Sequence, residues 1–100
     1  MKTKDQILIF LAQNKKLFRD KYHIIRIGLF GSYALEEQNI NSDIDLLVEF
    51  EENTLDLYEL KLQLKDFFLN NLRIEIDVCR EKYIKPRIKK HILEETVYVD

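Results

Sequence analysis

Hydrophobic positions along the chain recur with two different periods, one typical of helices and one typical of strands. Near the N-terminus, Thr3-Lys4-Asp5-Gln6 matches a capping box, and apolar residues then return every three or four positions up to about Lys21. This spacing predicts one long amphipathic helix. The segment from His23 to Phe30 is short and rich in β-branched and apolar residues, so it predicts a largely buried strand.

Two later segments alternate strictly between apolar and other residues. In Asp43–Phe50 (DIDLLVEF), one face carries Ile44, Leu46, Val48 and Phe50, and the other carries Asp43, Asp45, Leu47 and Glu49. The same alternation occurs in Arg73–Cys79 (RIEIDVC), where Ile74, Ile76 and Val78 share a face opposite Arg73, Glu75, Asp77 and Cys79. Each segment therefore predicts a strand with one core face and one acidic face.

The remaining segments predict helices between and after these strands. Tyr33–Gln38 is expected to form a short helix with Ser32 as its N-cap. A longer helix is expected to begin after a cap at Asn53 or Thr54 and to end at about Asn70.

Pro86 suits the first turn of a final helix through about Glu95, because its missing N–H is unpaired there in any case. The expected order is α-β-α-β-α-β-α. This order predicts an α/β fold with a short mixed sheet flanked by helices.

Length and composition limit the organisation of the chain. One hundred residues, of which 46% are hydrophobic, suit one domain over residues 1–100 with one modest core. The N-terminus lacks the pattern of a signal peptide, and no apolar stretch approaches membrane-spanning length. The single cysteine, Cys79, cannot form an internal disulfide and fits a reducing compartment. Together these features predict a cytoplasmic protein without membrane contact.

Charge is distributed unevenly. Acidic residues dominate the stretch from Glu36 to Asp66, whereas basic residues dominate Arg80–His91. An acidic centre is expected where cations are held, and it argues against direct binding of nucleic acid. The basic stretch is typical of a solvated helix face.

Asp43, Asp45 and Asp77 are the residues that point to chemistry. Asp43 and Asp45 leave the same face of a strand with Cα atoms about 6.5–7 Å apart, and their mutual repulsion is relieved by a divalent cation such as Mg²⁺. If the strand that carries Asp77 lies beside theirs, three carboxylates converge, as in two-metal sites for displacement at phosphorus. Gly31-Ser32, between a strand and a helix, suits the binding of phosphate oxygens.

Neither motif is specific alone, because Gly-Ser turns and Asp-x-Asp pairs are common in ordinary loops and edge strands. Their combination in order along the chain is what indicates a site. Other candidates favour structural roles: Cys79 as a small packed residue, Glu75 as a solvated strand position, and His23 and His91 as isolated side chains.

The stretch GLFGSYALEEQNINSDIDLLVEF (Gly28–Phe50), with IEIDV (Ile74–Val78), resembles the DNA polymerase beta-like nucleotidyltransferases. Within that superfamily it is similar to the minimal nucleotidyltransferases (MNT) that accompany HEPN-domain toxins, and the closing stretch KYIKPRIKKHILEETVYVD extends the similarity over nearly the whole chain. The resemblance implies that Gly31 and Ser32 hold a nucleoside triphosphate. It also implies that Asp43 and Asp45 bind two Mg²⁺ ions and that Asp77 completes the catalytic metal site.

The resemblance further implies the reaction and its setting: an antitoxin that transfers AMP from ATP to a tyrosine of a partner HEPN RNase. One departure matters here. Many relatives read G-S-x-A-R-G after the strand, whereas Leu35 and Glu36 stand here in place of the arginine and glycine. A catalytically degraded binding module that neutralises a toxin by complex formation therefore stays an alternative. An enzyme modifying a small molecule is disfavoured by the short chain, and homo- or hetero-oligomerisation is left open.

Overall fold

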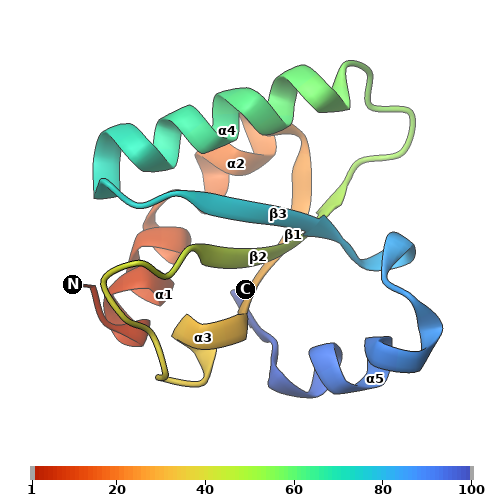
Figure 1. The fold of residues 1–100 in the computed structure, drawn as a ribbon. Coiled ribbons are helices and arrows are strands. Elements are labelled where there is room, and N and C mark those ends of the chain that lie inside the picture. The colour runs from red at the N-terminus through yellow and green to blue at the C-terminus, as the bar shows by residue number, and fades with distance from the viewer. Residues whose placement is uncertain (1, 100) are drawn as a thin grey trace.

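The computed structural model describes residues 2–99 as a four-stranded sheet with helices on both sides (Figure 1). Its elements are α1 (Lys4–Gln13), α2 (Lys15–Tyr22), β1 (Ile24–Phe30), α3 (Gly31–Ala34), β2 (Ile44–Phe50), α4 (Leu57–Leu72), β3 (Ile76–Arg80), the 3-10 helix η1 (Glu81–Tyr83), α5 (Pro86–Glu95) and β4 (Val97–Val99). The predicted α/β class is confirmed. No helix in the described part is long and apolar enough to cross a membrane.

The sheet is mixed, with strand order β3-β2-β1-β4. β1 runs antiparallel to both β2 and β4, whereas β2 and β3 are parallel and are connected through α4. Figure 1 shows α2 and α4 on one side of the sheet and α3 and α5 on the other. The parallel pair matters most for the site, because both of its strands begin at the same edge of the sheet.

The main core lies between the sheet and the helices α1, α2 and α4. The predicted core face of β2 is confirmed, since Ile44 and Leu46 are fully buried. Helix residues meet it with aromatic rings: Phe18 of α2 stacks on Phe68 of α4 with ring centroids 5.8 Å apart. Leu47, on the opposite face of β2, is only 1% exposed, so the second face of the sheet is covered as well.

The prediction of a single N-terminal helix is wrong, because the helix is broken at Asn14. The predicted capping box at Thr3 and Gln6 is present, but α1 ends at Gln13 and α2 begins at Lys15. The Phe10 carbonyl accepts both the Asn14 backbone N–H at 3.2 Å and the Asn14 side-chain amide at 2.9 Å, so the side chain caps the end of α1.

The predicted caps of the next two helices are also wrong. α3 begins at Gly31 and ends at Ala34, so Ser32 lies inside its first turn and is not the N-cap. α4 is capped by Asp56, while the Thr54 hydroxyl donates to the Glu51 carbonyl at 2.6 Å and stabilises the preceding loop. In neither helix does the side chain at the N-cap position, Phe30 for α3 and Asp56 for α4, make a capping hydrogen bond.

The last two strands, β3 and β4, also differ from the prediction. β3 begins only at Ile76, because Arg73 is the C-cap of α4 and has a left-handed backbone with φ 59°. β4 was not predicted at all. It pairs with β1, with Tyr98 opposite Gly28. A Cβ on Gly28 would lie 2.7 Å from Thr96 Cγ2, so glycine is what allows this segment to pack over β1. The final helix, Pro86–Glu95, is as predicted.

Candidate active site

The parallel pairing of β2 and β3 brings the predicted acidic residues together. Asp45 and Asp77 are partners in register, so they lie side by side on the same face, about 4.8 Å apart between strands. Asp43 precedes β2 by one residue and is exposed at the same edge of the sheet. The structure therefore gathers the three aspartates as the sequence predicted, at the start of the parallel strands.

The carboxylates at this edge repel one another, and Asp45 is also partly buried. The pKa of the Asp45 carboxyl is raised to about 6 from an ordinary value of 3.8, mainly because burial penalises its charged form. Neighbouring carboxylates contribute the rest of the rise, in the decreasing order Asp77, Asp43 and Glu95. An ionised cluster of this kind is stabilised by bound cations.

The turn at Gly31 lies directly against Asp45. Its backbone is left-handed, with φ +74°, and a Cβ at this position would collide with Asp45 Oδ2 and lie 2.9 Å from Asp45 Cγ. Phe30, the residue before it, is the register partner of Asp45 across β1 and β2. Only glycine therefore fits here, and it places the start of α3, including the half-buried Ser32, next to the aspartates.

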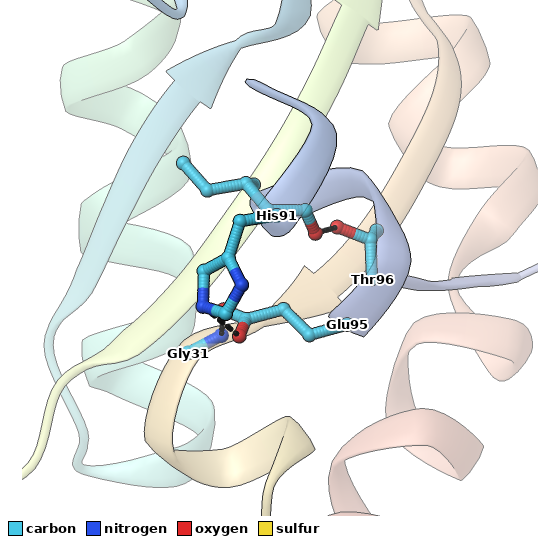
Figure 2. Close-up of polar contacts among 5 residues, drawn as sticks. Gly31, His91, Glu95 and Thr96 are labelled. Carbon is cyan, nitrogen blue, oxygen red and sulfur yellow. Dashed lines mark hydrogen bonds and ion pairs between the residues drawn. The ribbon is translucent and has the colours of Figure 1, made fainter. Parts of the chain in front are cut away.

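Glu95 is a fourth carboxylate at the site, which sequence reasoning missed. Figure 2 shows its side chain reaching from the end of α5 to the Gly31 turn, where its Oε1 accepts the Gly31 N–H at 3.2 Å. The Glu95 side chain is only 14% exposed, and its Oε2 lies 3.8 Å from His91 Nε2. The contact joins residues 64 positions apart, so no local pattern signals it.

Cys79 and the two histidines lie outside the carboxylate cluster. Cys79 shares the site face, and burial raises the pKa of its thiol, with further increases from Asp77 and Asp45. A thiol held in its protonated form is a poor metal ligand. His23 lies 3.7 Å from Glu51 at the other end of the sheet. The sequence suggested that His23 and His91 are isolated, but the structure gives each of them a glutamate neighbour.

The donor set suits magnesium in kind, because it consists of hard carboxylate oxygens. Among residues 2–99, no three His, Cys, Asp or Glu side chains are placed to hold an ion as they stand. A cation at this edge would therefore need the carboxylates to turn toward one another. The in-register pair and the raised pKa of Asp45 are the observations that fit such an ion.

Comparison with known proteins identifies the family of the chain. A family model described as a nucleotidyltransferase domain matches residues 11–99, which include the Gly31 turn and all three aspartates. The chain belongs to the nucleotidyltransferase domain family. The fold described above is accordingly that of a nucleotidyltransferase.

Close relatives of this nucleotidyltransferase match it from end to end. A Methanocaldococcus jannaschii protein assigned as a protein adenylyltransferase (MJ1379) is 41% identical over 99% of this chain and 100% of its own. The protein adenylyltransferase MntA of Thermococcus cleftensis is 36% identical over 99% and 98% of the two chains. The chain is thus an MntA-like nucleotidyltransferase.

Solved structures agree with this fold. One assigned as a minimal nucleotidyltransferase has a TM-score of 0.78 and 26% identity, and covers 96% of this chain and 95% of its own. A toxin–antitoxin structure with AMP-PNP has a TM-score of 0.64 and 23% identity, and covers 95% and 70% of the two chains. The minimal nucleotidyltransferase fold accounts for nearly all of the chain.

Proposed function

We propose that this nucleotidyltransferase transfers AMP from ATP to a tyrosine of a partner HEPN-domain RNase toxin, and thereby acts as an antitoxin in the cytoplasm. The observation that carries the proposal is the in-register pair Asp45 and Asp77 beside the Gly31 turn. The names of the relatives support protein as the acceptor, since they are protein adenylyltransferases.

Each site residue has a role that its position supports. The Gly31 turn and the Ser32 hydroxyl bind the triphosphate, because this turn is next to the carboxylates and opens a short helix. Asp43, Asp45 and Asp77 would hold a pair of Mg²⁺ ions, with Asp77 completing the catalytic one. When bound, the ions neutralise charge on the attacking and leaving oxygens.

The proposed transfer is a single displacement. The tyrosine oxygen attacks the α-phosphorus of ATP, so that one O–P bond forms while the bond between this phosphorus and the pyrophosphate oxygen breaks. Pyrophosphate leaves with the bonding electrons, and the phenol proton passes to the carboxylate of Asp77. The protein contributes chiefly position and charge, since little covalent chemistry is required of its side chains.

AMP on the toxin would silence it by electrostatics. A phosphodiester attached next to an RNA-binding surface adds negative charge, which repels the RNA backbone. This route needs only substoichiometric amounts of the enzyme, whereas inhibition by binding alone needs one chain for each toxin surface covered.

A binding module is the second candidate, and one specific observation favours it. Glu36 stands where many relatives have glycine, and its backbone is left-handed with φ 59°. A non-glycine residue in this conformation costs about 1–2 kcal/mol, and its charge lies just after the phosphate-binding turn. If the turn is weakened enough, the chain would neutralise its partner only by covering it.

Intact-mass spectrometry of the HEPN partner separates the two functions. After incubation with this chain, ATP and Mg²⁺, the partner should gain the mass of AMP, and Asp77→Asn should prevent the gain. The triple variant with Asn at positions 43, 45 and 77 serves as the second arm. An unmodified partner whose RNase activity is silenced by both the wild type and the triple variant would replace this proposal with the binding module.

A further inference from the structure

The hydrogen bond between Gly31 and Glu95 follows from the way β4 pairs with β1. Val97 is the register partner of Leu29, and the two strands run antiparallel. Glu95 lies two residues before Val97, and Gly31 lies two residues after Leu29, so the same register brings them opposite each other. The contact is therefore set by the sheet, although the two residues are 64 positions apart along the chain.

Neighbours on α5 orient the Glu95 side chain. The Thr96 hydroxyl donates to the Ile92 carbonyl at 2.7 Å and closes the last turn of the helix (Figure 2). His91, four residues before Glu95, has its Nε2 3.8 Å from Glu95 Oε2. One carboxylate oxygen thus faces His91, while the other accepts the Gly31 N–H at 3.2 Å.

The Gly31 N–H needs this acceptor because α3 lacks a side-chain N-cap. Phe30 occupies the N-cap position, and its side chain makes no capping hydrogen bond. The first N–H groups of a helix have no partner within the helix itself. Glu95 supplies an acceptor from a distant part of the chain, and so takes the place that Ser or Asp fills as the N-cap of other helices.

Gly31 is held from two sides. Its backbone lies directly against the Asp45 carboxylate, since a Cβ there would collide with Asp45 Oδ2, and its N–H is bound by Glu95. Glycine has more backbone conformations available than any other residue, so a turn built on it is not rigid by itself. Without the bond to Glu95 the turn is free to move away from Asp45, and Ser32 moves with it.

We propose that Glu95 is a positioning residue for nucleotidyl transfer: through the Gly31 N–H it holds the phosphate-binding turn against the aspartates. The inference rests on the proposed function and adds one residue to it. Glu95 acts through Gly31, because misplacing a substrate by about 1 Å can cost about a hundredfold in rate. The reach of its side chain matters and its charge does not, since a further negative charge beside a triphosphate is unfavourable in itself.

Two substitutions at position 95 separate reach from charge. Glu95→Asp keeps the charge and shortens the side chain by one methylene, whereas Glu95→Gln keeps the length and an acceptor oxygen and removes the charge. Glu94→Asp, at the exposed neighbouring position of α5, is the matched control. In calorimetry of the full chain with AMP-PNP and Mg²⁺, Glu95→Asp should bind roughly fivefold more weakly than wild type. Glu95→Gln and Glu94→Asp should stay within about twofold of wild type.

Hydrogen exchange of the Gly31 amide, followed by NMR, reports the bond itself. Exchange should be about tenfold faster in Glu95→Asp than in wild type, and Glu95→Gln and Glu94→Asp should exchange as wild type does. Faster exchange along α5 with an unchanged Gly31 amide would overturn the proposal, because Glu95 would then stabilise only its own helix.

The proposal is also overturned if Glu95→Gln weakens AMP-PNP as much as Glu95→Asp does, since charge and not reach would then be responsible. Unchanged AMP-PNP affinity in Glu95→Asp would overturn it as well. Failure of the wild type to bind AMP-PNP would instead contradict the proposed function, and the exchange of the Gly31 amide would still decide whether Glu95 holds the turn.

Discussion

Replacing Asp45 by asparagine should make the protein more stable without metal, although it removes a group to which we assign a catalytic role. The reason lies in the pKa of this carboxyl, which is about 6 in the folded chain against an ordinary value of 3.8. Below about pH 3.8 Asp45 is protonated in both the folded and the unfolded chain and has no effect. As pH rises to about 6, the unfolded chain ionises first, so wild-type stability falls.

The size of the effect follows from this difference in pKa. At 1.36 kcal/mol for each pKa unit, the interval corresponds to about 3 kcal/mol above pH 6. Asp45 is only half-buried, so solvent screening reduces the expected gain of Asp45→Asn to about 1–2 kcal/mol. For a chain of this length, that gain corresponds to a rise in Tm of roughly 5–15 °C.

Thermal unfolding of wild type and Asp45→Asn, measured from pH 3.5 to pH 7.5 in EDTA, is the assay. The difference in Tm should be near zero at the acid end and should grow through the interval between the two pKa values. Mg²⁺ should then raise the Tm of the wild type and not that of the variant. Asp66→Asn, at an exposed position of α4, is the control and should give no pH-dependent difference.

The reasoning is refuted if Asp45→Asn lowers Tm at pH 7 in EDTA. That result would mean that the Asp45 carboxylate is stabilised by its surroundings and is not strained by neighbouring charge. A constant difference across the whole pH range would also contradict it, because the predicted effect comes only from ionisation.

Three further predictions follow from backbone and charge at the same site. Glu36→Gly should raise the free energy of unfolding by about 1 kcal/mol, since φ is 59° there, and an unchanged urea midpoint would contradict this. Gly31→Ala should lower the free energy of unfolding by about 1–3 kcal/mol, because a Cβ collides with Asp45. It should also abolish AMP-PNP binding in calorimetry. Retained binding would show that the turn does not hold phosphate. Glu95→Gln should lower the pKa of Asp45 in a carboxyl ¹³C titration while the Gly31 N–H keeps an acceptor, and an unmoved pKa would place Glu95 outside the cluster.

The parts of the fold that sequence predicted are those fixed by periodicity. β2 alternates apart from Leu47, so its core face and the face of Asp45 were both predictable, as was the proximity of Asp77 once the two strands were assumed to be neighbours. Pro86 fixed the start of α5 in the same local way. Side-chain chemistry that depends on position in a strand or a first turn is readable from local sequence.

What sequence missed depends on contacts between distant segments or on a single competing bond. Asn14 caps the end of α1 with a side-chain bond to the Phe10 carbonyl, in a stretch whose apolar spacing continues without a break. β4 has three residues, too few to show a period, and exists because Gly28 leaves room for it. Glu95 lies at the end of α5, just before β4 pairs with β1, and reaches the site through a contact between residues 64 positions apart.

The positions of Asp43, Asp45 and Asp77 explain why having Leu35 and Glu36 in place of the relatives' arginine and glycine need not abolish activity. Both are exposed and neither contributes to the raised pKa of Asp45, so we expect the departure from relatives to affect binding of phosphate and to leave the aspartates intact. Leu35→Arg therefore serves as a restoration variant for calorimetry with AMP-PNP.

The central claim is that the aspartates Asp43, Asp45 and Asp77 move a nucleotide and not a terminal phosphate. It is tested most directly by incubating this chain and its HEPN partner with ATP labelled in either the α- or the γ-phosphate, with Mg²⁺ present. The account predicts that label from the α-phosphate becomes attached to the partner, that label from the γ-phosphate is released as pyrophosphate, and that Asp77→Asn stops both. Attachment of the γ-label, or undiminished attachment of the α-label with Asp77→Asn, would contradict it.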